Sequence, residues 1–197
     1  RNHLHHGAHH IKLFVSGGVL SPSDPLWMDQ FTDGEIQAAV EEAARRRTYV
    51  MAHAHTAAAV ARCVKNGIRT IEHATLIDRE AADAVAAAGA FVVPTLSIIE
   101  RIRTFALPQS SLDKLAELAD GARRAVEICR SAGVKVGLGT DYFGPMHGGE
   151  VQELVLRATI EPAYEVLRSA TSVNGSIVDP NGLLGRIVPG APADLIA

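Results

Sequence analysis

The sequence predicts an α/β fold that forms part of a (β/α)8 TIM barrel. Short apolar runs alternate with amphipathic segments, a pattern typical of parallel sheets covered by helices. About five such units follow one another in 197 residues, whereas a complete (β/α)8 barrel takes ~250 residues. The sequence contains neither GxGxxG nor GxxxxGK[ST], the phosphate loops of nucleotide-binding sheets. A partial barrel is therefore favoured over an open, doubly wound sheet.

The first half of the chain contains most of the expected strands. HHIKLFVSGG is predicted to be a strand that ends in a glycine turn, followed by a polar loop over residues 21–31. A helix is expected to begin at Thr32, because Glu35 stands three residues later in the spacing of a capping box. Strands are then expected in YVMAH, IRTIEH and AFVVPTLS, and helices in TAAAVARCVKN and DREAADAVAAAG.

The second half is expected to be more helical. Residues 100–120 have a mixed composition and are expected to cover one end of the fold. The expected elements after them are a helix in GARRAVEICRSAG, a strand in VKVGLGTD, and helices in GEVQELVLRATI and EPAYEVLRSATS. The final stretch, GRIVPGAPADLIA, is expected to begin a further strand.

Composition excludes several classes of function. The net charge of -3 and the mixture of both signs do not resemble the basic surface of a nucleic-acid-binding protein. Cys63 and Cys129 lack CxxC spacing, which argues against a disulfide framework or a zinc knuckle. No apolar run reaches the ~20 residues of a membrane span, so a soluble, cytoplasmic protein is expected. Because the chain starts without Met and stops inside an apparent strand, we expect a fragment of a longer protein.

Chemically useful side chains stand at the ends of several expected strands. In a barrel, the carboxyl ends of the strands converge on one mouth, where catalysis takes place. Imidazole nitrogen and carboxylate oxygen are zinc ligands, and a catalytic zinc site keeps one position open for water. The candidates are Lys12, His53, His73 and Asp141, with Thr95 and Ser97 near the end of the strand between them.

Each candidate also has a structural interpretation. A single histidine at a strand end can be a hydrogen-bonded core residue, Asp141 can cap the following turn, and the stem of Lys12 can reach solvent. Their occurrence together on four strands makes a metal site as reasonable as these alternatives. The histidines of the first ten residues are better explained as a solvated helix end: His3, His5, His6, His9 and His10.

The chain resembles the amidohydrolase superfamily, in particular its imidazolonepropionase-like and Xaa-Pro dipeptidase (prolidase-like) branch. The motifs that carry the resemblance run in family order: HHIKLFVSGGV, AHAHT, GIRTIEHATLID, AFVVPTLS, GLGTDYFGPMHG and GRIVPGAPADLIA. The resemblance implies strands four to eight of the barrel in residues 1–185. It also implies the start of the return to a small β-sandwich in residues 186–197.

The resemblance also implies roles for individual residues. Lys12 would be carboxylated, and its carbamate would bridge two zinc ions. His53 and His73 would ligate the second zinc, while Asp141 would bind the first and move the proton of the bridging hydroxide. His55 and His147 would contact substrate. The family's HxH on strand one, which supplies the other ligands of the first metal, is absent from these 197 residues.

The function expected is metal-dependent hydrolysis, by a zinc-activated hydroxide, of an amide bond in a dipeptide or at the C-terminal residue of a short peptide. A cyclic amide, as in imidazolonepropionase-like enzymes, is the alternative substrate. Without the HxH ligands, the chain could instead be a catalytically incomplete fragment that serves as a binding or assembly module. The expected partner is a small molecule or short peptide, with no nucleic acid and no membrane. A homo-oligomer is also compatible, because an incomplete barrel exposes apolar edges.

Overall fold

Five parallel strands form one sheet in the order in which they occur along the chain. The computed structural model describes residues 1–179 and 181–195. The strands are β1 (Ile11–Phe14), β2 (Val50–Thr56), β3 (Thr70–Leu76), β4 (Phe91–Val93) and β5 (Lys135–Val136). Their order in the sheet is β1-β2-β3-β4-β5, and every neighbouring pair is parallel. A doubly wound sheet reverses its strand order at a switch point, so this uninterrupted order confirms a barrel-type α/β arrangement.

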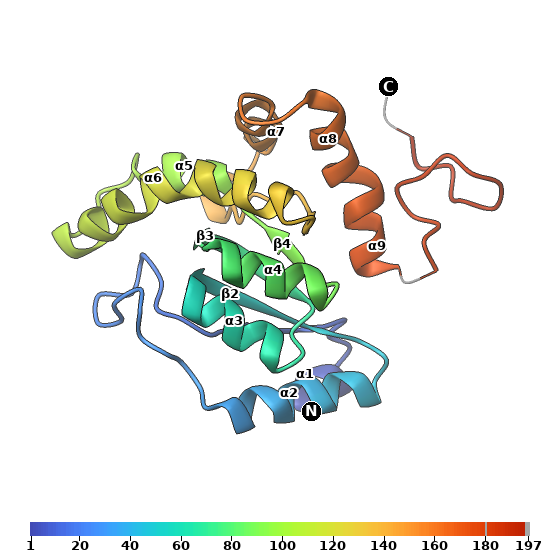
Figure 1. Cartoon of the computed structure of the whole chain (residues 1–197), viewed down its shortest axis with the longest axis horizontal. Coiled ribbons are helices and arrows are strands. Elements are labelled where there is room, and N and C mark those ends of the chain that lie inside the picture. The colour runs from blue at the N-terminus through green and yellow to red at the C-terminus, as the bar shows by residue number, and fades with distance from the viewer. Residues whose placement is uncertain (180, 196–197) are drawn as a thin grey trace.

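Helices follow most of the strands and cover the outer face of the sheet. α3 and α4 lie across the sheet in Figure 1, with α2 below them and α5 and α6 above. The last helices stack at the side of the sheet toward the C-terminus. Their bounds are α1 (Asn2–His5), α2 (Asp33–Arg45), α3 (Ala57–Lys65), α4 (Arg79–Ala87), α5 (Leu96–Ile102), α6 (Gln109–Ser131), α7 (Val151–Ala158), α8 (Ala163–Arg168) and α9 (Asn174–Val178).

The main core lies between the outer face of the sheet and these helices. Side chains alternate along a strand, so β2 sends Val50, Ala52 and Ala54 into this core and its histidines to the opposite face. The small residues on β2 allow α3 to approach closely, and α3 contributes Val60 and Cys63. Complete burial of one valine stabilises the fold by about 1.5–3 kcal/mol. The inner face is left for polar residues.

α2, α3 and α4 are capped locally at their first turns, and the turns that lead from β2 to α3 and from β3 to α4 are short. Thr32 and Glu35 form the expected capping box: the Thr32 amide donates to Glu35 Oε2 at 2.7 Å, and the Glu35 amide to Thr32 Oγ1 at 3.3 Å. Thr56 and Asp78 cap α3 and α4 through their side-chain oxygens. Since Thr56 is also the last residue of β2, the helix cap fixes the position of the two histidines just before it.

One sequence prediction is wrong in the middle of the chain. β4 ends at Val93, and Ser97 lies inside α5 rather than on a strand. Pro94 has no N–H for the sheet, and the amides of Leu96 and Ser97 donate instead to Glu153, a partner more than fifty positions away. Residues 100–120, expected to cover one end of the fold, contain the end of α5 and the first half of the 23-residue α6.

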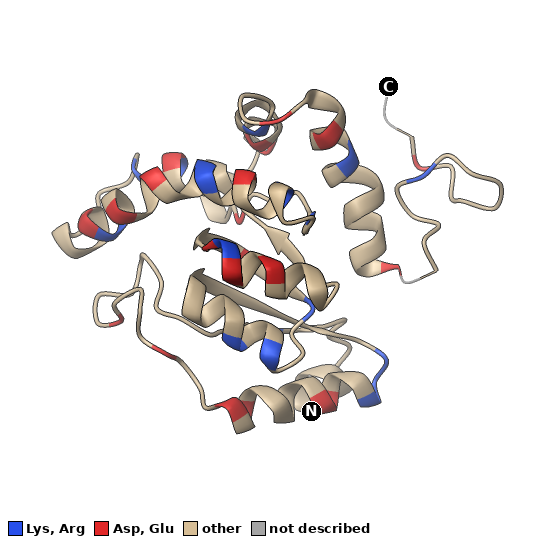
Figure 2. Ribbon diagram, in the orientation of Figure 1, with Lys and Arg blue, Asp and Glu red and all other residues tan. Residues whose placement is uncertain are grey.

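The two ends of the chain differ from the central sheet. α1 confirms the expected helix end before the first strand. In the described part of the final stretch, residues 185–195, no strand or helix is present, and residues 196–197 lie outside the described residues. Basic and acidic side chains are interspersed over the helices (Figure 2). Among the described helices, none combines the length and apolarity that crossing a bilayer requires.

Candidate active site

Three histidine rings from β2 and β3 meet on the inner face of the sheet. We call His53, His55 and His73 the histidine cluster. Their ring centroids lie 4.6 Å (His53–His55), 4.7 Å (His53–His73) and 4.9 Å (His55–His73) apart. All three residues are buried. The structure therefore brings together His53 and His73, the two histidines predicted as ligands, and adds His55 to the same group.

Each ring of the histidine cluster is held through one nitrogen. His73 Nδ1 lies 2.6 Å from Thr95 Oγ1, and His55 Nδ1 lies 3.1 Å from the hydroxyl of Thr75. His53 Nε2 lies 3.2 Å from the carbonyl oxygen of Gly17. A carbonyl only accepts, so this contact places the proton of His53 on Nε2 and leaves a lone pair on Nδ1. Histidines that bind metals are oriented in this way, through the nitrogen that does not face the metal.

The electrostatics of the cluster favour neutral imidazoles. Burial lowers the pKa of His53 to about 4, although the Gly17 carbonyl opposes this shift. Burial also lowers the pKa values of His55 and His73 well below the ordinary value, and the neighbouring histidines lower them further. At neutral pH all three rings are therefore uncharged, and the neutral ring is the form that coordinates a cation.

Asp141 and Lys12 complete the polar part of the site. Asp141 Oδ2 lies 3.9 Å from His73 Nε2, and the Asp141 side chain is 53% exposed. Burial raises the pKa of Asp141, and the charge of Lys12 opposes that shift. The Lys12 ammonium lies 5.7 Å from the centre of the Phe14 ring. The four strand-end residues singled out in the sequence thus border a single cavity.

The backbone is strained where three neighbouring strands end. His73, Thr95 and Asp141 have φ angles of 74°, 50° and 56°. These are left-handed conformations, which cost a residue other than glycine about 1–3 kcal/mol and which concentrate at functional sites. In these conformations Thr95 Oγ1 lies 2.6 Å from His73 Nδ1, and Asp141 Oδ2 lies 3.9 Å from His73 Nε2. Nothing in the sequence indicated this strain, because none of these residues is glycine.

The cavity above the histidine cluster has a volume of about 470 Å³ and two chemically different sides. The polar side contains the histidine cluster, Lys12 and Asp141. The opposite side, which we call the apolar wall, is formed by α5 and α6. It consists of Ile98, Ile99, Ile102, Leu115 and Leu118. Sequence reasoning missed this wall, although the three- and four-residue spacing of apolar side chains in α6 was a usable signal.

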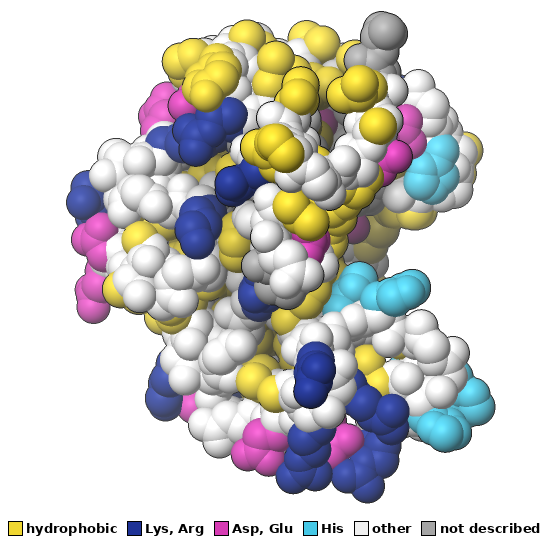
Figure 3. Space-filling view, turned by 90° about the vertical axis from the view of Figure 1, so that its right-hand side faces the viewer, with side chains coloured by type: hydrophobic (Ala, Val, Ile, Leu, Met, Phe, Trp, Pro, Cys, Tyr) yellow, Lys and Arg dark blue, Asp and Glu magenta, His cyan; other side chains and the backbone are white. Residues whose placement is uncertain are grey.

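One predicted substrate contact, His147, lies outside this cavity. His147 is 64% exposed at its side chain and pairs with Glu150, 3.1 Å away. It does not line the cavity, and its contact with substrate stays a prediction. The five amino-terminal histidines are all exposed, as expected for a solvated helix end. Figure 3 shows histidine side chains, in cyan, projecting from the surface on this side of the molecule.

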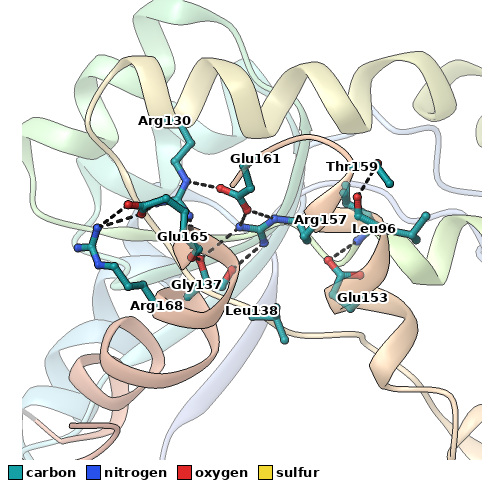
Figure 4. Close-up of polar contacts among 12 residues, drawn as sticks. Leu96, Arg130, Gly137, Leu138, Glu153, Arg157, Thr159, Glu161, Glu165 and Arg168 are labelled. Carbon is teal, nitrogen blue, oxygen red and sulfur yellow. Dashed lines mark hydrogen bonds and ion pairs between the residues drawn. The ribbon is translucent and has the colours of Figure 1, made fainter. Parts of the chain in front are cut away.

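A second group of polar side chains, largely buried, holds the backbone segments that carry Thr95 and lead to Asp141. We call Arg130, Glu153, Arg157 and Glu161 the arginine cluster. Glu153 accepts hydrogen bonds from the amides of Leu96 at 3.1 Å and Ser97 at 2.7 Å (Figure 4). These amides follow Thr95 directly, so Glu153 fixes the residue that orients His73. Arg157 donates to the Gly137 carbonyl at 3.0 Å and thereby holds the segment that leads to Asp141.

The side chains that line the cavity are of the types that bind metal ions, although they are not arranged as a complete coordination shell. Within residues 1–179 and 181–195, no three His, Cys, Asp or Glu side chains are already arranged around one point. Each ring of the histidine cluster nevertheless keeps one nitrogen free of its holding contact, and a carboxylate faces His73. Nitrogen and carboxylate donors of this kind suit zinc and similar divalent ions.

A parallel barrel-type sheet with histidine and aspartate at its strand ends defines a class of hydrolase-like (β/α) proteins. The chain belongs to the amidohydrolase family, whose family model matches residues 1–197. It is 35% identical to ochratoxinase of Aspergillus niger over 202 residues, covering 100% of this chain and 42% of that protein. The resemblance seen in the sequence motifs is thereby confirmed.

Solved structures give the same result. A prolidase crystallised with N-methylphosphonate-L-proline superposes with a TM-score of 0.93 at 44% identity, over 98% of this chain and 48% of that one. A Xaa-Pro dipeptidase with bound methionine gives a TM-score of 0.87 at 31% identity, over 96% of this chain and 48% of that one. The chain thus spans about half the length of these relatives.

Proposed function

We propose that this chain contributes the metal- and substrate-binding half of a hydrolase that cleaves an amide bond in a small substrate. The observation that supports this most strongly is the histidine cluster, with one nitrogen of each ring held and Asp141 within 4 Å of His73. Membership of the amidohydrolase family supports the same chemistry. The complete activity requires ligands beyond those on this chain.

Zinc would be held by Lys12, His53, His73 and Asp141, with Lys12 as a carbamate. Bound zinc lowers the pKa of a water molecule toward neutrality and polarises a carbonyl group. The chain's residues support such binding because the rings of His53 and His73 are neutral and oriented. An ammonium cannot ligate a cation, whereas a carbamate on Lys12 would offer two anionic oxygens.

The proton transfers are assigned to Asp141. Its carboxylate accepts a proton from the attacking water and returns it to the nitrogen of the leaving amine, as a general base and then a general acid. The carboxylate borders the cavity, with its Oδ2 3.9 Å from His73 Nε2, which supports this role. His55 would contact substrate, because it is buried in the wall of the same cavity.

The substrate proposed is a dipeptide or the C-terminal residue of a short peptide. Two of the relatives are described as a prolidase and a Xaa-Pro dipeptidase. The cavity of about 470 Å³ suits a small molecule rather than a folded protein. A cyclic amide is the alternative within the same chemistry, and dipeptide and cyclic substrates should be assayed side by side.

The decisive experiment measures metal content and hydrolysis together. The full-length protein that contains this chain should be purified without chelator in bicarbonate buffer. Plasma emission should then find about two zinc ions per active site, as expected of a binuclear centre, and the protein should release proline from Xaa-Pro dipeptides. Lys12→Ala should abolish hydrolysis, and a small carboxylate such as formate should restore part of it. Full activity of Lys12→Ala without rescue would remove Lys12 from the mechanism. Protein with neither metal nor hydrolysis would favour the binding-module alternative.

A further inference from the structure

The connection between β1 and α2 forms one rim of the cavity and is folded tightly on itself. The Gly17 amide donates to the Met28 carbonyl at 3.1 Å, and the Gln30 amide donates to the Val15 carbonyl at 3.0 Å. A Cβ at Gly17 would lie 2.0 Å from the Pro25 carbonyl oxygen, so only glycine fits there. We call residues 17–25 the rim loop. It contains no helix or strand, and inside it the hydroxyls of Ser21 and Ser23 donate to Asp24.

Lys114 attaches the rim loop to α6, because all three N–H donors of its ammonium bond to this loop. Its Nζ donates to the carbonyl oxygens of Gly18 at 3.0 Å, Ser21 at 2.6 Å and Asp24 at 2.7 Å. An ammonium has three N–H groups, and each has a backbone carbonyl as its partner. Three carbonyls from one loop converge on a single cation, which is a more specific arrangement than a surface ion pair.

The attached loop touches both the histidine cluster and the cavity. Gly17 O faces His53 Nε2 at 3.2 Å, and a Cβ on Gly18 would lie 3.5 Å from His53 Cε1. Val19 and Leu20 line the cavity, and Val19 packs against the hydrophobic cluster that contains the apolar wall. The same turn of α6 supplies a second contact, in which Ser111 Oγ donates to the Val19 carbonyl at 2.8 Å. Because the Gly17 amide keeps its own bond to the Met28 carbonyl, displacement of the rest of the rim loop would change the width of the cavity and not the orientation of His53.

We propose that Lys114 is a positioning residue that sets substrate selectivity by fixing the rim loop against α6. Lys114 does not itself line the cavity; it acts through the carbonyls of Gly18, Ser21 and Asp24. The geometric part of this proposal is independent of the reaction. Its kinetic part rests on the proposed function, because it requires a substrate whose apolar group lies between Val19 or Leu20 and the apolar wall.

The geometric part is tested by hydrogen exchange with mass spectrometry on Lys114→Met in the full-length protein. We expect amides in residues 17–30 to exchange at least ~10-fold faster, and amides in β2 and β3 to be unchanged, because local opening affects only the segment released. The matched control is Lys65→Met, which removes the same charge from an ammonium bonded to Asp33. Unchanged exchange in residues 17–30 of Lys114→Met would overturn the proposal.

A truncated variant tests whether the ammonium itself is responsible. In Lys114→Ala, n-propylammonium replaces the missing stem and all three N–H donors, whereas tetramethylammonium provides charge without donors. Slow exchange should return with the first compound and not with the second. Equal restoration by both, or by neither, would contradict the proposed carbonyl contacts. If the Met variant does not fold, this pair of cations still decides the question.

The kinetic consequence is a change in KM rather than in kcat. For Lys114→Met we expect KM to rise about 10-fold for substrates with a bulky apolar group, kcat to stay within about threefold, and the glycine analogue to be little affected. Equal changes for apolar and glycine substrates would refute the selectivity role. Faster exchange in a protein that hydrolyses no amide would instead reject the proposed function and leave the attachment by Lys114 intact.

Discussion

The histidine cluster and the arginine cluster are both buried groups of polar side chains, yet their bonding differs. In the arginine cluster the charges are matched by partners: Arg157 Nε donates to Glu161 at 2.6 Å, and Arg130 Nε donates to the other oxygen of Glu161 at 2.6 Å (Figure 4). In the histidine cluster each ring has one held nitrogen, and no hydrogen bond among the described residues engages the other nitrogen. The arginine cluster uses its hydrogen-bonding groups within the fold, whereas the histidine cluster leaves one nitrogen of each ring without a hydrogen bond in the described part of the chain.

This difference separates structural from functional burial. A nitrogen that makes no hydrogen bond within the fold adds nothing to its stability, so stability alone does not explain the unused nitrogens of the histidine cluster. The strained φ angles of His73, Thr95 and Asp141 carry a free-energy cost at the same place. The arginine cluster has no residue in a left-handed conformation. We therefore expect substitutions in the first group to affect activity, and those in the second to affect stability.

The largest effect is expected for Asp141→Asn. The amide is isosteric but cannot accept the proton, so the hydrolytic rate should fall about 10²- to 10⁴-fold. Stability measured by urea unfolding in the presence of chelator should change by less than ~1 kcal/mol, because the side chain is 53% exposed. Asp83→Asn, which removes an exposed ion pair with Arg79 in α4, is the matched control. A large loss of stability in Asp141→Asn would place Asp141 with the structural residues.

Arg157→Met should have the next largest effect, on the free energy of unfolding. Its removal takes from the buried Glu161 one of its two cations and leaves only Arg130, and removing one partner of a buried ion pair costs about 3–5 kcal/mol. Chemical denaturation should show this loss as a lower midpoint. Arg168→Met removes a half-exposed arginine from its ion pair with Glu165 and should cost less than ~1 kcal/mol. Similar losses in both variants would mean that burial does not distinguish the two ion pairs.

A smaller effect is expected where the two clusters meet. Thr95→Val removes the hydroxyl that orients His73 and should weaken metal affinity about 10- to 100-fold, as is typical of residues that orient a ligand. The affinity can be measured by competition with a chromophoric chelator. Thr104→Val, whose hydroxyl bonds only the Arg101 carbonyl of its own turn, should leave the affinity unchanged. Equal affinity in the Thr95 variant and the parent would exclude a role for this hydrogen bond.

The smallest effect concerns the two buried thiols. Burial raises the pKa of Cys63 and of Cys129 to about 12, and near Cys129 the charges of Arg157 and Arg130 oppose the shift. The unfolded chain releases these protons near the ordinary thiol pKa of about 8.5. The thiols therefore leave the free energy of unfolding unchanged below that pH and lower it as the pH rises toward 12. Each thiol should contribute about 1.4 kcal/mol per pH unit in this range. Urea titrations at pH 9 and 10 should show this slope, and it should be smaller in Cys63→Ala and Cys129→Ala.

Local signals explain what could be predicted from the sequence. The capping box at Thr32 depends on residues three positions apart, and the strands follow from short apolar runs, so both are visible without a fold. Lys12, His53, His73 and Asp141 could be grouped because parallel strands in a barrel end at one mouth. The structure places all four around one cavity.

Other features depend on residues far apart in the chain. The helix start after β4 depends on Glu153, and the rim loop depends on Lys114, 96 positions away from Gly18. The sequence contained no signal for either partner, because hydrogen bonds of this kind follow no local period.

The sequence by itself determined the parallel strand–helix order and the residue types at the strand ends. Periodicity and caps act over at most one helical turn, and they suffice for that. Only the tertiary structure decided which nitrogen of each histidine is held, which backbone angles are strained, and that α5 and α6 face the histidine cluster across a cavity. These properties arise where segments distant in sequence pack together, and their energies exist only once the chain is folded.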